Sequence, residues 1–240
     1  MRIIAGQTDY RTLCERIRSS PDQEIIVDEC LGQRYIGCGL SGKSIVINGT
    51  PGNALGAYMD GCAVTVMGNA QDAVGDTMDD GSIVIHGSVG DAVGYSMRGG
   101  MILVERDAGY RAGIHMKSYR EKQPLLVIGG RPGSFLGEYQ AGGVIVVLQR
   151  FGGAENFVCN FCGNGMHGGK IFVRSDTRPV GPPPNISVAE ATAADKAELS
   201  AYVEPYCKAF GADREEILSH RFYVMTPDSK NPYRQLYTHK

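Results

Sequence analysis

The chain has 240 residues, a formal net charge of −2 and 33 glycines, about twice the usual share of glycine. The near-neutral charge excludes a strong field for nucleic acid, and no apolar run approaches the roughly 18 residues that cross a membrane. Seven cysteines, and the lack of an apolar signal-peptide core after Met1, predict a reduced, cytoplasmic protein. We therefore expect neither nucleic acid nor a membrane among its partners.

Residues 1–24 are predicted to form an N-terminal helical cap. One helix face within 8–19 is outlined by apolar side chains three and four positions apart: Tyr10, Leu13, Cys14 and Ile17. Thr8 or Asp9 could cap this helix. Such a helix would cover the open end of a repeat structure, whose first strand edge would otherwise be unpaired.

A glycine that follows a small residue, usually an aliphatic one, returns at regular spacing through the middle of the chain. These repeat glycines are Gly37, Gly56, Gly75, Gly94, Gly113, Gly137 and Gly163. They are 19, 19, 19, 19, 24 and 26 residues apart, so the two longer steps hold insertions of five and seven residues. An alternating aliphatic stretch typical of a strand follows each glycine. A lead-in strand at 24–28 is expected first, with Ile26 nineteen residues before Ile45.

Seven units of one template predict a mainly β fold. Nineteen residues are too few for two packed helices, whereas short strands that repeat in register can stack on their counterparts. We expect a right-handed, single-stranded parallel β-helix of about seven coils over residues 25–175. The insertions near 117–123 and 149–158 are expected to form loops on one face, which is often the binding face of such repeats.

Residues 176–240 are predicted to be a proline-rich linker followed by a helical C-terminal extension. Three consecutive prolines favour an extended, stiff segment. Helix starts are predicted at three capping-box pairs: Ser187 with Glu190, Asp195 with Glu198, and Asp213 with Glu216. Gly211 is expected to end the second helix. The last residues either lie along the repeat or form a docking arm for a partner protein.

Cys159 and Cys162 form a C-x-x-C motif, and His167 follows closely. A functional interpretation is a redox pair or part of a metal site. However, Cys162 occupies the slot that a small aliphatic residue fills in the other units, where a free cysteine packs as a small hydrophobic group. We predict that the chain binds no metal and no cofactor, and that Cys159, Cys162 and His167 are the candidates if it does bind a metal.

Four cations in and after the fifth unit are candidates for a partner contact: Arg111, Lys117, Arg120 and Lys122. A basic group of this kind fits an acidic partner or a ligand phosphate. The alternative is an ordinary solvated face. No histidine is placed beside a cysteine or serine as in a nucleophile site, and no carboxylate pair recurs at a common slot. We therefore predict no catalytic residues.

The turns G-x-x-G-x-x-x-G at 49–56 and 87–94, with M-x-x-G-x-x-x-V after the second, resemble the C-terminal β-helix domain of the large subunit of glutamate synthase. The size of the chain resembles the stand-alone form of that domain. The resemblance covers about 30–175 and extends into the helical tail. The same repeat occurs in one of the subunits of formylmethanofuran dehydrogenase and in one of the subunits of N-methylglutamate synthase.

The resemblance implies a scaffold. In glutamate synthase, ammonia released in an amidotransferase domain passes through a tunnel to an FMN site. This chain would brace that junction as a non-catalytic subunit, with FMN and an iron–sulfur cluster in a partner. The partners implied are a glutamine amidotransferase subunit and an FMN-binding synthase subunit, and assembly of identical copies is also open. The alternatives are the corresponding component of a formylmethanofuran dehydrogenase or of an N-methylglutamate synthase, and an independent metal or redox protein that uses the C-x-x-C.

Overall fold

The computed structural model describes residues 1–152 and 156–228. Its elements in chain order are β1 (Arg2–Ile4), α1 (Tyr10–Ser19), β2 (Glu24–Leu31), β3 (Ser44–Thr50), β4 (Asp60–Val66), β5 (Asp80–Ile85), β6 (Met101–Val104), β7 (Leu125–Ile128), β8 (Ala141–Val147), β9 (Gly168–Arg174), β10 (Ile186–Glu190), α2 (Ala193–Phe210), α3 (Arg214–Ser219) and β11 (Phe222–Pro227). Within these ranges, 11 strands form one sheet in the order β1 to β9, then β11 and β10. The prediction of a mainly β protein is confirmed.

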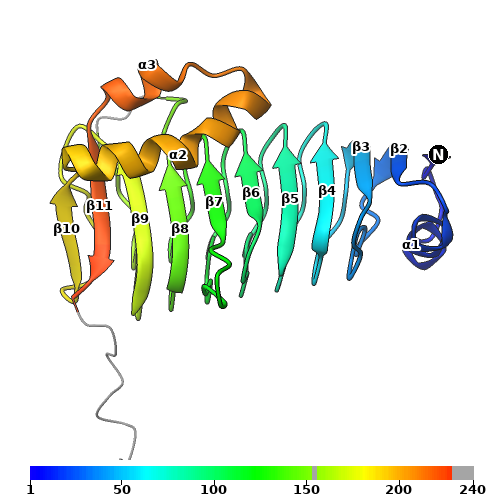
Figure 1. Cartoon of the computed structure of the whole chain (residues 1–240), viewed down its shortest axis with the longest axis horizontal. Helices are drawn as coiled ribbons and strands as arrows, with labels where there is room; N and C mark the ends of the chain where they lie inside the picture. Colours follow the sequence, from blue (N-terminus) through cyan, green and yellow to red (C-terminus); the bar gives the residue numbers. More distant parts are fainter. Residues whose placement is uncertain (153–155, 229–240) are drawn as a thin grey trace, which may run out of the picture.

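Neighbouring strands from β1 to β9 are parallel, and they follow the chain order (Figure 1). Matched positions in the register are Ile45, Val64, Ile83, Ile102, Leu126, Ile145 and Ile171. The predicted register of the lead-in strand was wrong, because Ile25 rather than Ile26 pairs with Ile45. An irregularity between Val27 and Cys30 then restores the 19-residue step.

The inward side chains of the units stack above one another in ladders. The residues that precede the repeat glycines are all fully buried: Ile36, Leu55, Val74, Val93, Ala112, Leu136 and Cys162. The alternating strand pairs are buried as well, from Ile45 and Ile47 to Ile171 and Val173. Each unit therefore covers the apolar side chains of its neighbours, as expected of stacked repeats.

The turn around each repeat glycine uses left-handed backbone at three positions. The glycine has a φ between +62° and +77° in all seven units, and the residues two before and two after it also have positive φ. The Gly75 N–H donates to Leu55 O of the preceding unit, whereas the Ala73 N–H donates to Asp91 O of the next unit, both at 2.8 Å. The alternating direction ties each turn to both neighbours.

Helix α1 lies at the β1 end of the sheet (Figure 1). Asp9 is its N-cap and accepts the backbone N–H groups of Arg11 and Thr12 at 3.0 and 3.2 Å. Leu13 and Ile17 are fully buried in the main hydrophobic cluster. The predicted helix is present, but the edge of β2 is covered by a strand that was not predicted, because β1 pairs with β2 in parallel. The boundaries of an N-terminal cap at 1–24 stay a prediction.

Helix α2 lies across one face of the C-terminal strands (Figure 1). Its Leu199, Val203 and Tyr206 belong to a second hydrophobic cluster, to which β6, β7, β8, β9 and β11 also contribute. Strands β3 and β4 contribute no residue to this cluster. None of the helices in the described part of the chain is long and apolar enough to cross a membrane.

The segment predicted to open the first C-terminal helix is a strand instead. Ser187 and Glu190 lie in β10, which pairs antiparallel with β11. Strand β11 also pairs with β9, so β11 and β10 extend the sheet at its C-terminal end. The capping-box pattern spans four residues and cannot anticipate a strand partner at 222–227. Residues 229–240, considered as a docking arm, lie outside the described residues.

Helix α2 begins three residues earlier than predicted. Its capping box is Thr192 with Asp195, rather than Asp195 with Glu198. Asp195 Oδ2 accepts the Thr192 N–H at 2.9 Å, and Thr192 Oγ1 accepts the Asp195 N–H at 3.2 Å. As predicted, Gly211 ends this helix in left-handed backbone and Asp213 caps the next one.

The two insertions lie at opposite ends of parallel strands, which corrects the expectation of a shared face. Insertion 117–123 precedes β7, whereas 149–158 follows β8, and residues 153–155 lie outside the described residues. We call the edge where β3–β9 begin the turn edge, since the repeat glycines lie there. The edge where these strands finish is called the strand-end edge.

Candidate functional site

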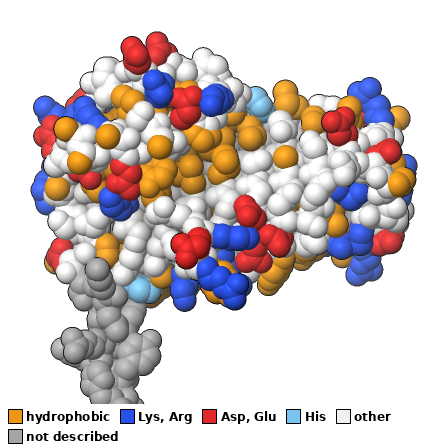
Figure 2. All heavy atoms as spheres, in the orientation of Figure 1, with side chains coloured by type: hydrophobic (Ala, Val, Ile, Leu, Met, Phe, Trp, Pro, Cys, Tyr) orange, Lys and Arg blue, Asp and Glu red, His pale blue; other side chains and the backbone are white. Residues whose placement is uncertain are grey.

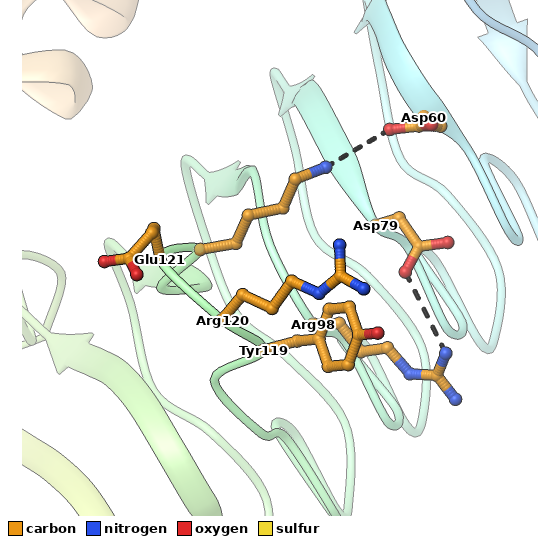
Figure 3. Close-up of a pocket in the computed structure, with 7 residues that line it drawn as sticks. Asp60, Asp79, Arg98, Tyr119, Arg120 and Glu121 are labelled. Atoms are coloured by element: carbon orange, nitrogen blue, oxygen red, sulfur yellow. Dashed lines mark hydrogen bonds and ion pairs between the residues drawn. The ribbon is translucent and has the colours of Figure 1, made fainter.

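A charged hollow of about 490 Å³ lies on the turn edge beside insertion 117–123. Its lining residues are Asp60, Asp79, Arg98, Tyr119, Arg120, Glu121 and Lys122. Figure 3 shows Tyr119 and Arg120 extending from the insertion toward Arg98 and Asp79. Figure 2 shows acidic and basic side chains gathered along the lower edge of the molecule.

The 19-residue period places these charges above one another. Asp60, Asp79, Arg98 and Lys117 each stand four residues after a repeat glycine in successive units. The charge in this column changes from negative to positive between Asp79 and Arg98, and there Arg98 Nη1 lies 4.0 Å from Asp79 Oδ1. Lys117, predicted to contact a partner, is exposed at the next step of this column.

Lys122 fastens the insertion to earlier units. Its Nζ lies 3.4 Å from Asp60 Oδ1 and 3.2 Å from Asp80 Oδ2. The hydrogen bond to Asp80 raises the pKa of Lys122, and the one to Asp60 adds to this effect. Because its charge is engaged within the chain, Lys122 is less available to a partner than the neighbouring Arg120.

Arg120 is the cation of the hollow that keeps its charge uncompensated. It stands on left-handed backbone with a φ of +55°, and its Cζ lies 5.2 Å from the centre of the Tyr119 ring. No ion pair links it to another described residue. A guanidinium held in this way can receive a carboxylate through two parallel hydrogen bonds.

Arg111 lies apart from the hollow, in a column formed by the residues two before the repeat glycines. Its Cζ is 4.9 Å from the ring centre of Phe135, which stacks on Phe161 with ring centres 4.9 Å apart. Arg111 Nε also lies 3.8 Å from Glu138 Oε2. Thus the structure brings Lys117, Arg120 and Lys122 to one neighbourhood but leaves Arg111 in another.

A second column follows the repeat glycines. The His115 ring stacks on Tyr139 with centres 5.1 Å apart, and Tyr95 meets His115 edge-on at 5.9 Å. We call the two sets together the aromatic columns: Arg111, Phe135 and Phe161, and Tyr95, His115 and Tyr139. These columns were not predicted. The available signal was the presence of large residues at equivalent positions of neighbouring units, as in Phe135 and Phe161 or His115 and Tyr139.

Cys159 and Cys162 are brought together at the turn of the last unit, and both are buried free thiols. Cys159 Sγ donates to Gly133 O at 3.3 Å, and Cys162 Sγ lies 3.6 Å from Met225 Sδ. The hydrogen bond between the two thiols lowers the pKa of Cys159 and raises that of Cys162, which burial raises further. Cys162 sits in the core slot expected from the repeat.

His167 is not joined to the two cysteines as a third ligand. Its Nδ1 lies 3.2 Å from Gly165 O. Among the residues that the structure describes, no three His, Cys, Asp or Glu side chains lie close enough to hold a metal ion. That the chain carries no metal and no cofactor stays a prediction, as does the absence of catalytic residues.

Comparisons with known proteins agree with the repeat architecture. The profile of the family described as GXGXG motif matches residues 24–228. A protein of Methanocaldococcus jannaschii named Uncharacterized protein MJ1350 is 41% identical over 249 residues, which cover 98% of this chain and 95% of that protein.

A solved structure gives a further comparison. One chain of the formyltransferase/hydrolase complex FhcABCD from Methylorubrum extorquens, in complex with methylofuran, has a TM-score of 0.68. It is 21% identical, and the match covers 87% of this chain and 75% of that chain. At this identity the similarity concerns the fold.

Proposed function

Because the chain belongs to the GXGXG motif family, we propose that it is a non-catalytic structural component of a multi-subunit enzyme complex and holds its partners along the turn edge. The observation that carries this proposal is the pair of aromatic columns. Five of the six residues, all except Tyr95, stand there on left-handed backbone, and Phe161 is 54% exposed.

Such residues are costly to keep on the surface of an isolated subunit. Left-handed backbone costs roughly 1–2 kcal/mol for a residue other than glycine. Stacking of two aromatic rings contributes only about 0.5–1.5 kcal/mol of stabilisation. Aromatic and arginine side chains are also the types that contribute most to protein–protein binding.

Among parent complexes, the comparisons support the formylmethanofuran alternative best. The solved neighbour is a chain of a formyltransferase/hydrolase complex, and the match spans most of both chains. We therefore propose a role like that of the β-helix component of a formylmethanofuran dehydrogenase, in which this chain is one part of a larger assembly.

The glutamate synthase interpretation is the second candidate. It rests on the turn motifs at 49–56 and 87–94. In that case the partners would be a glutamine amidotransferase and an FMN and iron–sulfur protein, or the related components of N-methylglutamate synthase. The cytoplasmic location belongs to the same proposal.

We propose a right-handed parallel β-helix of seven coils at 25–175, followed by the linker and extension at 176–240. The parallel register of β2–β9 and the turn-to-turn hydrogen bonds support it.

The test is purification of the tagged chain from its native cells under anaerobic conditions. We expect defined partner subunits to co-purify, and the double variant Phe135→Ala/Phe161→Ala to lose them at least tenfold. Met67→Ala is the matched control, since Met67 is 51% exposed on the strand-end edge. Recovery of intact complex with the folded double variant would rule out docking at the columns.

Turnover by the isolated chain decides whether it is non-catalytic. Supplied with glutamine, 2-oxoglutarate and a reductant, it should form no glutamate, and it should release no formyl group from formylmethanofuran. Activity in either assay would refute the structural role. The identity of the co-purified proteins, read by mass spectrometry, chooses between the two parent complexes.

A further inference from the structure

Three arginines lie at the strand-end edge, which is the edge of the sheet opposite the hollow. Arg106 follows β6, Arg150 follows β8, and Arg174 is the last residue of β9. The backbone hydrogen bonds of successive units link these positions, as Gly130 N donates to Arg106 O and Arg150 N donates to Gly129 O, both at 2.8 Å. The cluster therefore depends on the stacking of separate units.

Two of the guanidinium groups share one aromatic ring. Arg106 Cζ lies 4.2 Å from the ring centre of Phe151, and Arg150 Cζ lies 5.7 Å from the same centre. Arg150 Nη1 also donates to Tyr206 Oη at 3.4 Å. Phe151 thus holds both cations at the surface, and Tyr206 of helix α2 holds Arg150 as well.

The third arginine adjoins buried polar atoms that have no partner. Gln149 Nε2 donates to Arg174 O at 2.6 Å, but Gln149 Oε1 and Arg174 Nε are buried without a hydrogen bond to any described residue. Gln149 is 1% exposed and has a φ of +44°, unusual for a residue other than glycine. Burial lowers the pKa of Arg174, and the charge of Arg150 lowers it further, against the opposite effect of Glu216 and Asp176.

No carboxylate of the described residues forms an ion pair with these three arginines. Glu216 is engaged by His220, with His220 Nε2 at 2.8 Å from its Oε1. Asp176 contributes its backbone oxygen, which accepts a hydrogen bond from Arg221 Nη1 at 2.9 Å. Neighbouring like charges repel one another, so an anion bound between them would remove this repulsion.

We propose that Arg106, Arg150 and Arg174 form a binding site for a phosphate-class oxyanion. A lone carboxylate is satisfied by one arginine through two parallel bonds, whereas three separate guanidinium groups match the several oxygens and double charge of a phosphate. The anion is either free phosphate or a phosphate group of a larger ligand. This site does not depend on the docking surface or on the parent complex.

Isothermal titration calorimetry of the whole chain at low salt tests the site. The probes are inorganic phosphate, pyrophosphate, adenosine monophosphate and malonate. We expect saturable binding of at least one phosphate probe. The affinity should fall at least tenfold in Arg106→Gln and in Arg150→Gln, with little change in Arg16→Gln. Arg16 is an exposed residue of α1 and serves as the charge-matched control.

The probes separate the sources of the anion. Tighter binding of adenosine monophosphate than of phosphate supports a ligand-borne group, and the reverse order supports the free ion. Stronger binding of malonate than of every phosphate probe would overturn the phosphate class. The site itself would be disproved by a lack of saturable binding, or by equal affinity in the folded Arg106→Gln variant and the control.

Discussion

A repeat position can require glycine for two separate reasons: a positive φ, and a lack of space for a Cβ atom. Gly137 has a φ of +62°, and a Cβ atom there would lie 2.7 Å from Ile171 Cδ1 and 2.9 Å from Gln140 Oε1. Gly39 has nearly the same φ, +61°, but nothing lies within 4 Å of its added Cβ. The two positions therefore separate backbone strain from lack of space.

We predict that Gly137→Ala lowers the free energy of unfolding by about 2–4 kcal/mol, because left-handed strain adds to overpacking of the core. Gly39→Ala should cost only the strain, about 1–2 kcal/mol. Urea denaturation followed by circular dichroism measures both. Equal losses in the two variants would show that the space beside Gly137 does not limit the residue.

Helix α2 depends on a local cap and on a distant surface. Thr192 and Asp195 exchange two hydrogen bonds at its start, and the bonds from Thr192 lower the pKa of Asp195. The contribution of these bonds is present at neutral pH and declines as the pH falls and the carboxylate is protonated. Further along α2, Tyr206 Oη donates to the backbone oxygen of Glu105, directly after β6, at 3.1 Å.

Thr192→Ala is expected to lower the free energy of unfolding by about 1 kcal/mol at pH 7, since it removes the cap of α2. The deficit relative to the wild type should shrink toward acidic pH. Ser187→Ala is the control, because this exposed serine lies in β10 and should change stability by less than about 0.5 kcal/mol. A larger loss in the control than in Thr192→Ala would contradict the assignment of the cap.

Along the whole molecule, helix α2 covers the sheet only toward its C-terminal end. Leu103, Val127, Val146 and Phe172 are buried beneath α2, whereas the equivalent faces of β3 and β4 lie outside that cluster. In a stack whose units contact only their neighbours, stability can vary along the axis. The two edges differ as well, with the aromatic columns and the charged hollow on one and the arginine cluster on the other.

Native-state hydrogen exchange should show this difference. We expect amides of β7 and β8 to exchange at least tenfold more slowly than those of β3 and β4, because α2 buries one face of the former. Leu199→Ala should reduce this difference by accelerating exchange in β7 and β8, with β3 and β4 unchanged. Uniform protection from β3 to β8 would mean that the stack opens as one cooperative unit.

Much of the fold was predictable because the repeat acts through short distances along the chain. The residues before the repeat glycines, from Ile36 to Cys162, are buried as their shared slot predicts. The same slot predicted the burial of Cys162. The predicted register of β2 was wrong by one residue, because nothing in 24–31 reveals the irregularity after Val27.

The candidate surfaces were predictable only in part. Of the four basic residues noticed in the sequence, Arg120 and Lys122 line one hollow, whereas Arg111 lies apart from it. The partners of Lys122, Asp60 and Asp80, lie about 60 and 40 residues earlier along the chain, at a separation set by the stacking of units. Which charges are compensated could therefore not be read from the chain alone.

The amino-acid sequence alone determined the repeat, its parallel strands and its buried ladders, because a fixed period places like side chains above one another. The tertiary structure decided which strands α2 covers, how β10 and β11 extend the sheet, and that Arg106, Arg150 and Arg174 meet at one edge. Those contacts join segments whose separation in the chain follows no period, so no local pattern specifies them.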